Sequence, residues 1–282
     1  MKFLRDFEGK FIFASSLIMT IIISSTTLLH HLFPEILRIP SVRGPYTINP
    51  FWLDLLYIDS LTIVLSNVLI YHGIKTQGKF KTISFFYGSI IFSGLEENIW
   101  ILTGRFNILP FKTYFFTRGG LWFFEIPLSV CLVWFIITWS CVYVAEIIFP
   151  NKKYAFHAFI AGIFAVSLDL FIDPMMVNLG ATSLFSDSEG MWVWLSDPNT
   201  SFLIFSIPFF NFLGWFFVIF GFLSLYGYIF DNLKIKSRGN KKSYLSFILG
   251  IPVMIITIFI IILLVNYPIQ ALLGGIDIIP VE

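Results

Sequence analysis

The chain alternates between long apolar runs and short polar segments. Each run reaches the length of about 20 residues that an α-helix needs to cross about 30 Å of hydrocarbon. Seven such runs are present, at residues 11–33, 53–73, 83–103, 121–148, 155–174, 202–230 and 244–266. The pattern predicts an all-α polytopic membrane protein, in which residues 1–282 form a single bundle of about seven transmembrane helices.

The overall composition agrees with this pattern. Hydrophobic residues make up 57% of the chain and charged residues only 12%, a balance that a soluble surface does not allow. The first run follows a basic segment, but it is too long for a signal peptide and lacks a small-x-small cleavage site, so we expect a retained span. We see no internal repeat and no low-complexity segment. The expected location is the cell membrane, crossed several times.

The distribution of basic residues predicts the orientation of the bundle. Thirteen of the eighteen Lys and Arg residues lie in the N-terminal segment and in the second, fourth and sixth loops. The other five lie in the first and third loops. The positive-inside rule therefore places the N-terminus in the cytoplasm. The net charge of +1, without a basic patch, argues against nucleic acid as a partner and leaves the lipid bilayer as the surrounding medium.

Cysteine and histidine give little sign of special chemistry. Cys131 and Cys141 are ten residues apart on one predicted span, about 15 Å along a helix, which is too far for a disulfide. We expect both to pack as apolar side chains. The four histidines (His30, His31, His72 and His157) fall near span ends without a second ligand at metal spacing, so we predict no metal site.

Buried acids are the strongest functional signal in the sequence. Residues of this kind within a span are costly in hydrocarbon and usually face a protein interior or a wet cavity. When the spans are laid out with alternating direction, their rise per residue places the acids and one amide in the outer half of the membrane. The residues are Glu96 and Glu97 on the third span, Asp169 and Asp173 on the fifth, and Asn211 on the sixth, with Glu125 at the outer rim.

Two interpretations of these acids remain open. Asp169 and Asp173 lie one helical turn apart, and they could pair with Arg105 or Arg118 simply to hold helices together. The acids outnumber the available bases, however, which favours a shared polar pocket. We expect Glu96, Glu125, Arg105, Trp192, Trp194 and Trp215 to contact a substrate there, whereas Trp100, Trp122, Trp134 and Trp139 are expected to pack or to anchor the interface.

Five segments, in this order, resemble a known family. They read ENIWILTGRFNILPFKTY, FEIPLSVCLVWFIITW, DLFIDPMMVNLG, MWVW and FSIPFFNFLGW, and they cover roughly residues 90–220. The chain is similar to the carotenoid biosynthesis membrane proteins, which include carotenoid hydratases of archaea and bacteria. The resemblance implies addition of water to the terminal double bond of an acyclic carotenoid, with a hydrophobic polyene or isoprenoid as substrate. It carries the family's acidic position over to Glu97, its paired aspartates to Asp169 and Asp173, and its amide to Asn211.

The chemistry of hydration suits these residues independently of the resemblance. Water adds to an isolated trisubstituted alkene after a carbon is protonated to give a tertiary cation. Two carboxyl groups buried side by side retain a proton between them, so Asp169 and Asp173 are candidates for the general acid. Glu97 or the other aspartate would accept the proton of the water, and Asn211 would position that water. This chemistry requires no cofactor and no metal, and the predicted activity is that of a hydro-lyase.

Two other functions were considered. The spacing DxxxD also occurs in intramembrane prenyltransferases, which bind magnesium and a diphosphate, but their first motif is absent from this sequence. A retinal protein needs a lysine inside the seventh span, which has none. A carotenoid-binding protein or a proton-coupled transporter without enzymatic activity remains an alternative, because the sequence gives residue types but not the shape of a cavity.

Overall fold

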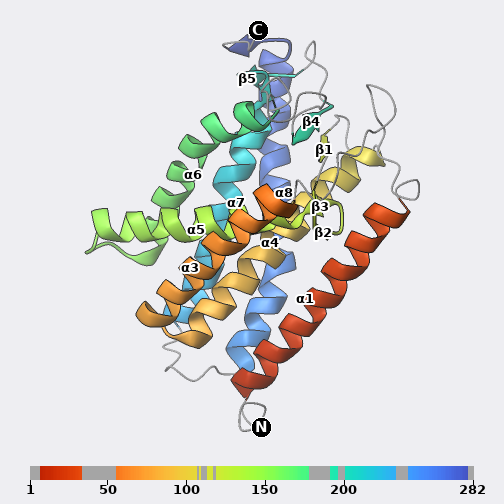
Figure 1. Cartoon of the computed structure of the whole chain (residues 1–282). Coiled ribbons are helices and arrows are strands. Elements are labelled where there is room, and N and C mark those ends of the chain that lie inside the picture. The colour runs from red at the N-terminus through yellow and green to blue at the C-terminus, as the bar shows by residue number, and fades with distance from the viewer. Residues whose placement is uncertain are drawn as a thin grey trace.

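A computed structural model describes residues 7–33, 55–106, 108, 113–116, 119–177, 191–195, 201–232 and 241–278. Within these ranges, seven long α-helices form a bundle (Figure 1). They are α1 (Phe7–Leu32), α3 (Ser60–Thr76), α4 (Lys79–Arg105), α5 (Leu128–Ile148), α6 (Tyr154–Val177), α7 (Phe209–Gly227) and α8 (Lys241–Leu273). A π-helical turn, η3 (Leu55–Asp59), leads into α3, and a second, η6 (Tyr228–Asn232), follows α7. Each predicted span contains one of these helices, so the predicted all-α membrane bundle is confirmed.

Six helical segments of the described chain are long and apolar enough to cross a membrane. They are Gly9–Leu32, Leu56–Thr76, Leu128–Ile148, Tyr154–Val177, Phe209–Phe230 and Leu245–Leu273. The remaining helix, α4, is 27 residues long and contains two glutamates near its middle. It contacts α1, α3, α5, α7 and α8, which places it at the centre of the bundle. The surrounding helices therefore cover its polar positions.

One face of α6 consists of small residues followed by the two aspartates. Ala158, Ala161 and Ala165 are fully buried, and α6 packs closely against α7. Small side chains allow neighbouring membrane helices to approach each other closely. Asp169 and Asp173 follow Ala165 at intervals of four residues and so continue the same buried face. The small face of α6 thus turns both aspartates into the bundle.

The predicted fourth and sixth spans begin later than expected. Residues 121–127 and 202–208 form short hairpins instead of helical turns, namely β2 (Trp122–Phe123) with β3 (Ile126–Pro127), and β5 (Leu203–Ile204) with β6 (Ile207–Pro208). Pro127 and Pro208 are the N-cap residues of α5 and α7, with ψ angles of 139° and 132°. Proline has no N–H to donate and disfavours helical geometry in the residue before it, so the helices start only after the prolines.

These two hairpins reveal an internal repeat, and the expectation of none was wrong. In both hairpins, the first residue of the first strand pairs with the proline that ends the second strand. Trp122 pairs with Pro127, and Leu203 pairs with Pro208. Each turn contains a phenylalanine, Phe124 or Phe205, with a φ of 54°. Each hairpin is preceded by a helix and a short strand, β1 (Tyr114–Phe116) or β4 (Trp192–Trp194), and is followed by a helix. The orders α4–β1–β2–β3–α5 and α6–β4–β5–β6–α7 are therefore the same. Apart from the Ile-Pro dipeptide that ends each hairpin, few side chains are identical between the two halves, so the hydrophobic pattern alone does not indicate the repeat.

The two repeats meet at a pair of short strands. Strand β1 (Tyr114–Phe116) pairs antiparallel with β4 (Trp192–Trp194), and Phe115 lies opposite Val193. A further pairing, parallel, joins β5 to β7 (Asp277–Ile278), which follows α8. The β1–β4 pair lies near one end of the bundle (Figure 1). It brings aromatic residues of both repeats together above the central helices.

The first helix, α1, is tied to the first hairpin by hydrogen bonds near its C-terminal end. Thr26 Oγ1 donates to the carbonyl of Trp122 at 2.6 Å, and Nε2 of His30 lies 2.7 Å from the carbonyl of Phe124. The His30 ring also stacks on the Trp122 ring with centroids 3.7 Å apart. Two of the histidines expected at span ends thus have structural partners, since His31 Nε2 lies 3.0 Å from the carbonyl of Gly120. Cys131 and Cys141 are free thiols and are buried in the bundle, as expected for apolar packing.

Candidate functional site

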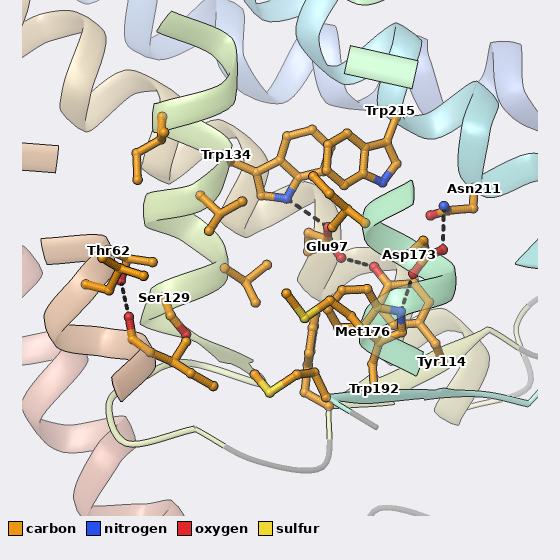
Figure 2. Close-up of a pocket in the computed structure, with 18 of the residues that line it drawn as sticks. Thr62, Glu97, Tyr114, Ser129, Trp134, Asp173, Met176, Trp192, Asn211 and Trp215 are labelled. Carbon is orange, nitrogen blue, oxygen red and sulfur yellow. Dashed lines mark hydrogen bonds between the residues drawn. The ribbon is translucent and has the colours of Figure 1, made fainter. Parts of the chain in front are cut away.

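An apolar pocket with a volume of about 510 Å³ lies between the two repeats and α3. Figure 2 shows the residues that line it. Most are aliphatic or aromatic, and the polar ones are Thr62, Glu97, Tyr114, Ser129, Asp173 and Asn211, with the indoles of Trp134, Trp192, Trp194 and Trp215. A pocket of this size with few polar groups is typical of a site for a hydrophobic ligand.

One end of the pocket is lined by carboxyl groups of both repeats. The amide of Asn211 donates both of its hydrogens, one to Asp169 Oδ2 at 2.7 Å and one to Asp173 Oδ2 at 2.8 Å. Asp173 lines the pocket together with Asn211, whereas Asp169 lies behind them, is fully buried and does not line it. The structure therefore brings the predicted aspartates and amide together, but only one aspartate faces the cavity.

Glu97 is the carboxyl group that α4 contributes to the same end. It accepts hydrogen bonds from the hydroxyl of Tyr114 and from Trp134 Nε1, the latter at 2.9 Å (Figure 2). Asp173 accepts one from the indole of Trp192. Tyr114 lies on β1 and Trp192 on β4, so each repeat supplies one carboxyl group and a strand donor that holds it. The polar end of the pocket is thus built from two similar halves.

Two indole rings cover this region from α5 and α7. Trp134 and Trp215 each follow the capping proline of their helix by seven residues, and their ring centroids are 4.4 Å apart. The side chain of Trp194 lies near the Asp173 carboxyl group, and within the described part of the chain its indole nitrogen is buried without a hydrogen-bond partner. Trp194 thus places a second indole of β4 beside Asp173, next to that of Trp192.

A second, much smaller cavity adjoins the polar end. Its volume is about 20 Å³, and the residues that line both cavities are Glu97, Tyr114, Trp134, Asn211 and Trp215. A cavity needs about 10–15 Å³ of this kind of volume to hold one water molecule, and the water needs polar partners. Glu96, Glu97 and Asn211 supply such partners. The small cavity therefore has the size and the polarity for one water molecule.

The other predicted contact residues are only partly brought to the pocket. Trp192, Trp194 and Trp215 line it. Glu96 accepts a hydrogen bond from the indole of Trp100 and lines the small cavity. Glu125 was expected to contact a substrate in the pocket, but it does not line the pocket. It lies in the turn of the first hairpin, where its backbone N–H donates to Asn98 Oδ1 at 2.9 Å. The side chain of Arg105 and all of Arg118 lie outside the described residues, so the expected ion pairs with the aspartates stay predictions.

Several functional residues were missed by sequence reasoning. Trp134 was expected to pack or to anchor the interface; it is indeed buried in the core, but it also lines the pocket and donates to Glu97. Tyr114, Thr62 and Ser129, which line the pocket, and Asp59, which lies next to Ser129, were not singled out. The signal for Trp134 was its position seven residues after a proline, which matches that of Trp215. Tyr114 gave no comparable signal, because its partner Glu97 lies on another element.

The pocket reaches the outer surface of the bundle along α3. Tyr57 and Leu61 line it and are both 59% exposed, and Leu65 lines it one turn further along. These side chains belong to a helical segment that is long and apolar enough to cross a membrane, and a bilayer around that segment would lie against them. A hydrophobic molecule dissolved in the bilayer can reach the pocket through this mouth without passing through water.

Fold and site together define a polytopic membrane protein whose helices enclose an apolar pocket with carboxyl groups at one end. The sequence model of the carotenoid biosynthesis proteins matches residues 57–280, and the chain belongs to this family. This confirms the resemblance and gives the protein a role in carotenoid biosynthesis. The match includes both repeats and every residue that lines the pocket. No curated protein and no solved structure matches the chain.

Proposed function

We propose that the protein adds water to the terminal C=C bond of an acyclic carotenoid and so forms a tertiary alcohol. The observation that carries the proposal is the convergence of Glu97, Asp173 and Asn211 on one end of an apolar pocket, beside a cavity with room for one water molecule. A hydratase of hydrocarbons needs these three features: a proton donor, a water molecule and an apolar binding surface. Membership of the carotenoid biosynthesis family supports a polyene as the substrate.

The first step is protonation of the alkene. A proton moves from a carboxyl group to the CH carbon of the terminal C=C bond. The other carbon of that bond, which carries two methyl groups, becomes a tertiary cation. Asp173 is suited to donate this proton because it lines the pocket and shares the amide of Asn211 with Asp169. Two buried carboxyl groups that are so close are not both ionised at low cost, and the pair retains a proton. Asp169 acts here as a positioning residue behind Asp173.

The second step is attack by water. A water molecule in the small cavity lies between Glu97 and Asn211, and its oxygen forms a bond to the cationic carbon. Glu97 accepts the proton that the water loses, and a proton then returns from Glu97 to the aspartate pair through water, so the net change is the addition of one water molecule. The indole faces of Trp134 and Trp215 line the same region, and aromatic faces attract a cation within about 6 Å. No residue outside the two repeats is needed for these steps.

The proposal is tested by expression in a host that accumulates acyclic carotenoids with terminal isopropylidene groups. Mass spectrometry of the extracted pigments should show products heavier by one or two water molecules. The Asp173→Asn and Glu97→Gln variants should lower product formation by about a hundred- to ten-thousand-fold, because an amide keeps the shape of the carboxyl group but cannot transfer the proton. Their protein levels should match the wild type, since neutralising a buried acid does not leave an unpaired charge.

A matched control is Asp277→Asn, because Asp277 lies on β7 and contacts Ser206 outside the pocket. This variant should form the product at the wild-type level. Unaltered pigments with the wild-type protein across several acyclic substrates would reject the hydratase and favour binding or transport of carotenoids. A product that carries an added prenyl unit and depends on magnesium would favour a prenyltransferase.

A further inference from the structure

A second group of polar side chains lies at the other end of the pocket, where the proposed reaction does not use it. In Figure 2, Thr62 and Ser129 lie on one side of the pocket, and Asp173 and Asn211 lie on the opposite side. Aliphatic residues of α5, such as Val130 and Val133, line the pocket between them. The two polar ends therefore belong to the same cavity but are separated by an apolar section.

Two buried oxygen atoms at this end, Asp59 Oδ1 and Ser129 Oγ, make no hydrogen bond of good geometry within the described part of the chain. Ser129 lies in the first turn of α5 next to the carboxyl group of Asp59, and the two side chains are 2% and 1% exposed. Asp59 Oδ2 accepts the backbone N–H of Leu121 at 2.7 Å. Buried polar atoms are nearly always paired, so Asp59 Oδ1 and Ser129 Oγ indicate a missing partner.

The available atoms define the chemistry of that partner. A carboxylate oxygen accepts a hydrogen bond, whereas a serine hydroxyl can both donate and accept one. Thr62 lines the same end, and its hydroxyl already donates to the carbonyls of Ile58 and Asp59, both at 3.0 Å. This hydroxyl can therefore accept a hydrogen bond from a ligand but cannot donate one. The matching ligand is therefore a small group that donates a hydrogen bond and accepts one in return. An O–H group does both.

We propose that Ser129 and Asp59 form a hydroxyl-binding subsite at the end of the pocket opposite the carboxyl groups. The O–H group is supplied either by a water molecule or by the tertiary alcohol at the end of an isoprenoid chain. The alcohol source rests on the proposed function, because that alcohol is the product of the hydration. Occupation by the alcohol would draw the hydrated end of the polyene away from Glu97 and Asp173, which would favour release of the product over its dehydration.

The test compares two polyene probes that differ only in one terminal tertiary hydroxyl group. Each probe is titrated into the purified protein in detergent, and binding is followed by the quenching of tryptophan fluorescence, since Trp134 and Trp215 line the pocket. If the alcohol is the source, the wild type should bind the hydroxylated probe about three- to tenfold more tightly, the range expected for one net hydrogen bond. The Ser129→Ala variant should bind both probes equally.

The matched control is Ser84→Ala. Ser84 is also a buried serine whose hydroxyl has no partner among the described residues, but it does not line the pocket. This variant should retain the preference of the wild type. A preference that Ser84→Ala loses together with Ser129→Ala would overturn the subsite.

A second measurement separates the two sources of the hydroxyl. An experimental map of the protein without polyene, at a resolution that shows ordered water, should contain a peak within hydrogen-bond distance of Ser129 Oγ and Asp59 Oδ1 if water is the ligand. In that case both probes bind equally. Equal binding without such a peak would overturn the proposal. If neither probe quenches the fluorescence, the polyene substrate of the proposed function is refuted, and the map alone decides whether the subsite exists.

Discussion

Asn211 is the residue on which the acidic end of the pocket depends most. Its single amide group bridges Asp169 and Asp173, which come from another helix and have no other described donor in common. Removing one partner of a buried hydrogen bond costs more than the bond itself contributes, because the remaining group stays desolvated. Asn211 thus has a structural role beside the positioning of water that we propose for it.

The Asn211→Ala variant should lower the free energy of unfolding by about 1–3 kcal/mol, since two buried carboxyl groups lose their shared donor. Thermal unfolding in detergent, followed by circular dichroism, measures the change. Adding Asp169→Asn to this variant should recover part of the loss, because the new amide lies one turn from Asp173 and can donate to it. The control is Asn67→Ala, since within the described ranges Asn67 donates to the carbonyl of Ile63 in its own helix and to no other group. An equal loss for both alanine variants would contradict the bridging role.

At the residue scale, the sequence predicted that the acids on α4 and α6 and the amide on α7 lie together, but not how they are held. Glu97, Asp169, Asp173 and Asn211 were evident because polar residues interrupt apolar runs. Their donors were not evident, since Tyr114 and Trp192 are aromatic residues in short strands that the sequence pattern does not distinguish from loops. Partners that meet only in the folded chain leave no mark on the hydrophobic pattern.

At the scale of elements, the junction between α4 and β1 positions Tyr114 against Glu97. Gly104 lies in the last turn of α4, and a Cβ atom there would lie 2.0 Å from Thr113 Oγ1 and 3.0 Å from the Thr113 nitrogen. Thr113 Oγ1 also donates to the carbonyl of Trp100 at 3.0 Å. The absence of a side chain at position 104 allows β1 to lie directly against the helix. This explains why glycine follows threonine in the ILTG segment.

The Gly104→Ala variant should therefore push β1 away from α4. We expect a loss of about 1–3 kcal/mol in the free energy of unfolding, as for other overpacked sites, together with reduced hydration of carotenoids. Gly214→Ala is the matched control for stability, because a Cβ atom at Gly214 meets nothing within 4 Å. Its melting temperature should be unchanged or higher, since alanine favours a helix more than glycine does. A normal melting temperature for Gly104→Ala would refute this account of the junction.

The elements also show where reading the hydrophobic pattern fails. The segments LWFFEIP and FLIFSIP are apolar and adjoin apolar helices, so both were assigned to spans. The structure forms hairpins there because Pro127 and Pro208 fix the starts of α5 and α7. The dipeptide Ile-Pro in both segments was the available signal, since the residue before a proline is disfavoured in a helix. Comparing these two segments would also have revealed the repeat.

At the scale of the whole molecule, the pocket connects the lipid phase to the centre of the bundle. Polar side chains from both repeats meet inside, while α3 provides the mouth that faces the membrane. A long polyene can keep most of its length in the bilayer while its end occupies the pocket. The predicted cytoplasmic N-terminus would place the carboxyl groups in the outer half of the membrane.

Access through this mouth gives a prediction for Leu61→Trp. The larger side chain should narrow the mouth and lower kcat/KM for a carotenoid in vesicles several-fold, while the melting temperature stays the same because Leu61 is 59% exposed. The control is Ile147→Trp, since Ile147 is 61% exposed on α5 and does not line the pocket. Equal rates for the two variants would show that the substrate takes another route.

The central claim is that the carboxyl end of the pocket adds water to a carbon–carbon double bond. The most direct measurement incubates the purified protein with an acyclic carotenoid in water enriched in oxygen-18 and determines the mass of the product. We predict a tertiary alcohol whose hydroxyl oxygen carries the label of the water, formed by the wild type and not by Asp173→Asn. A product whose oxygen is unlabelled, or labelled product formed equally by both proteins, would contradict the account.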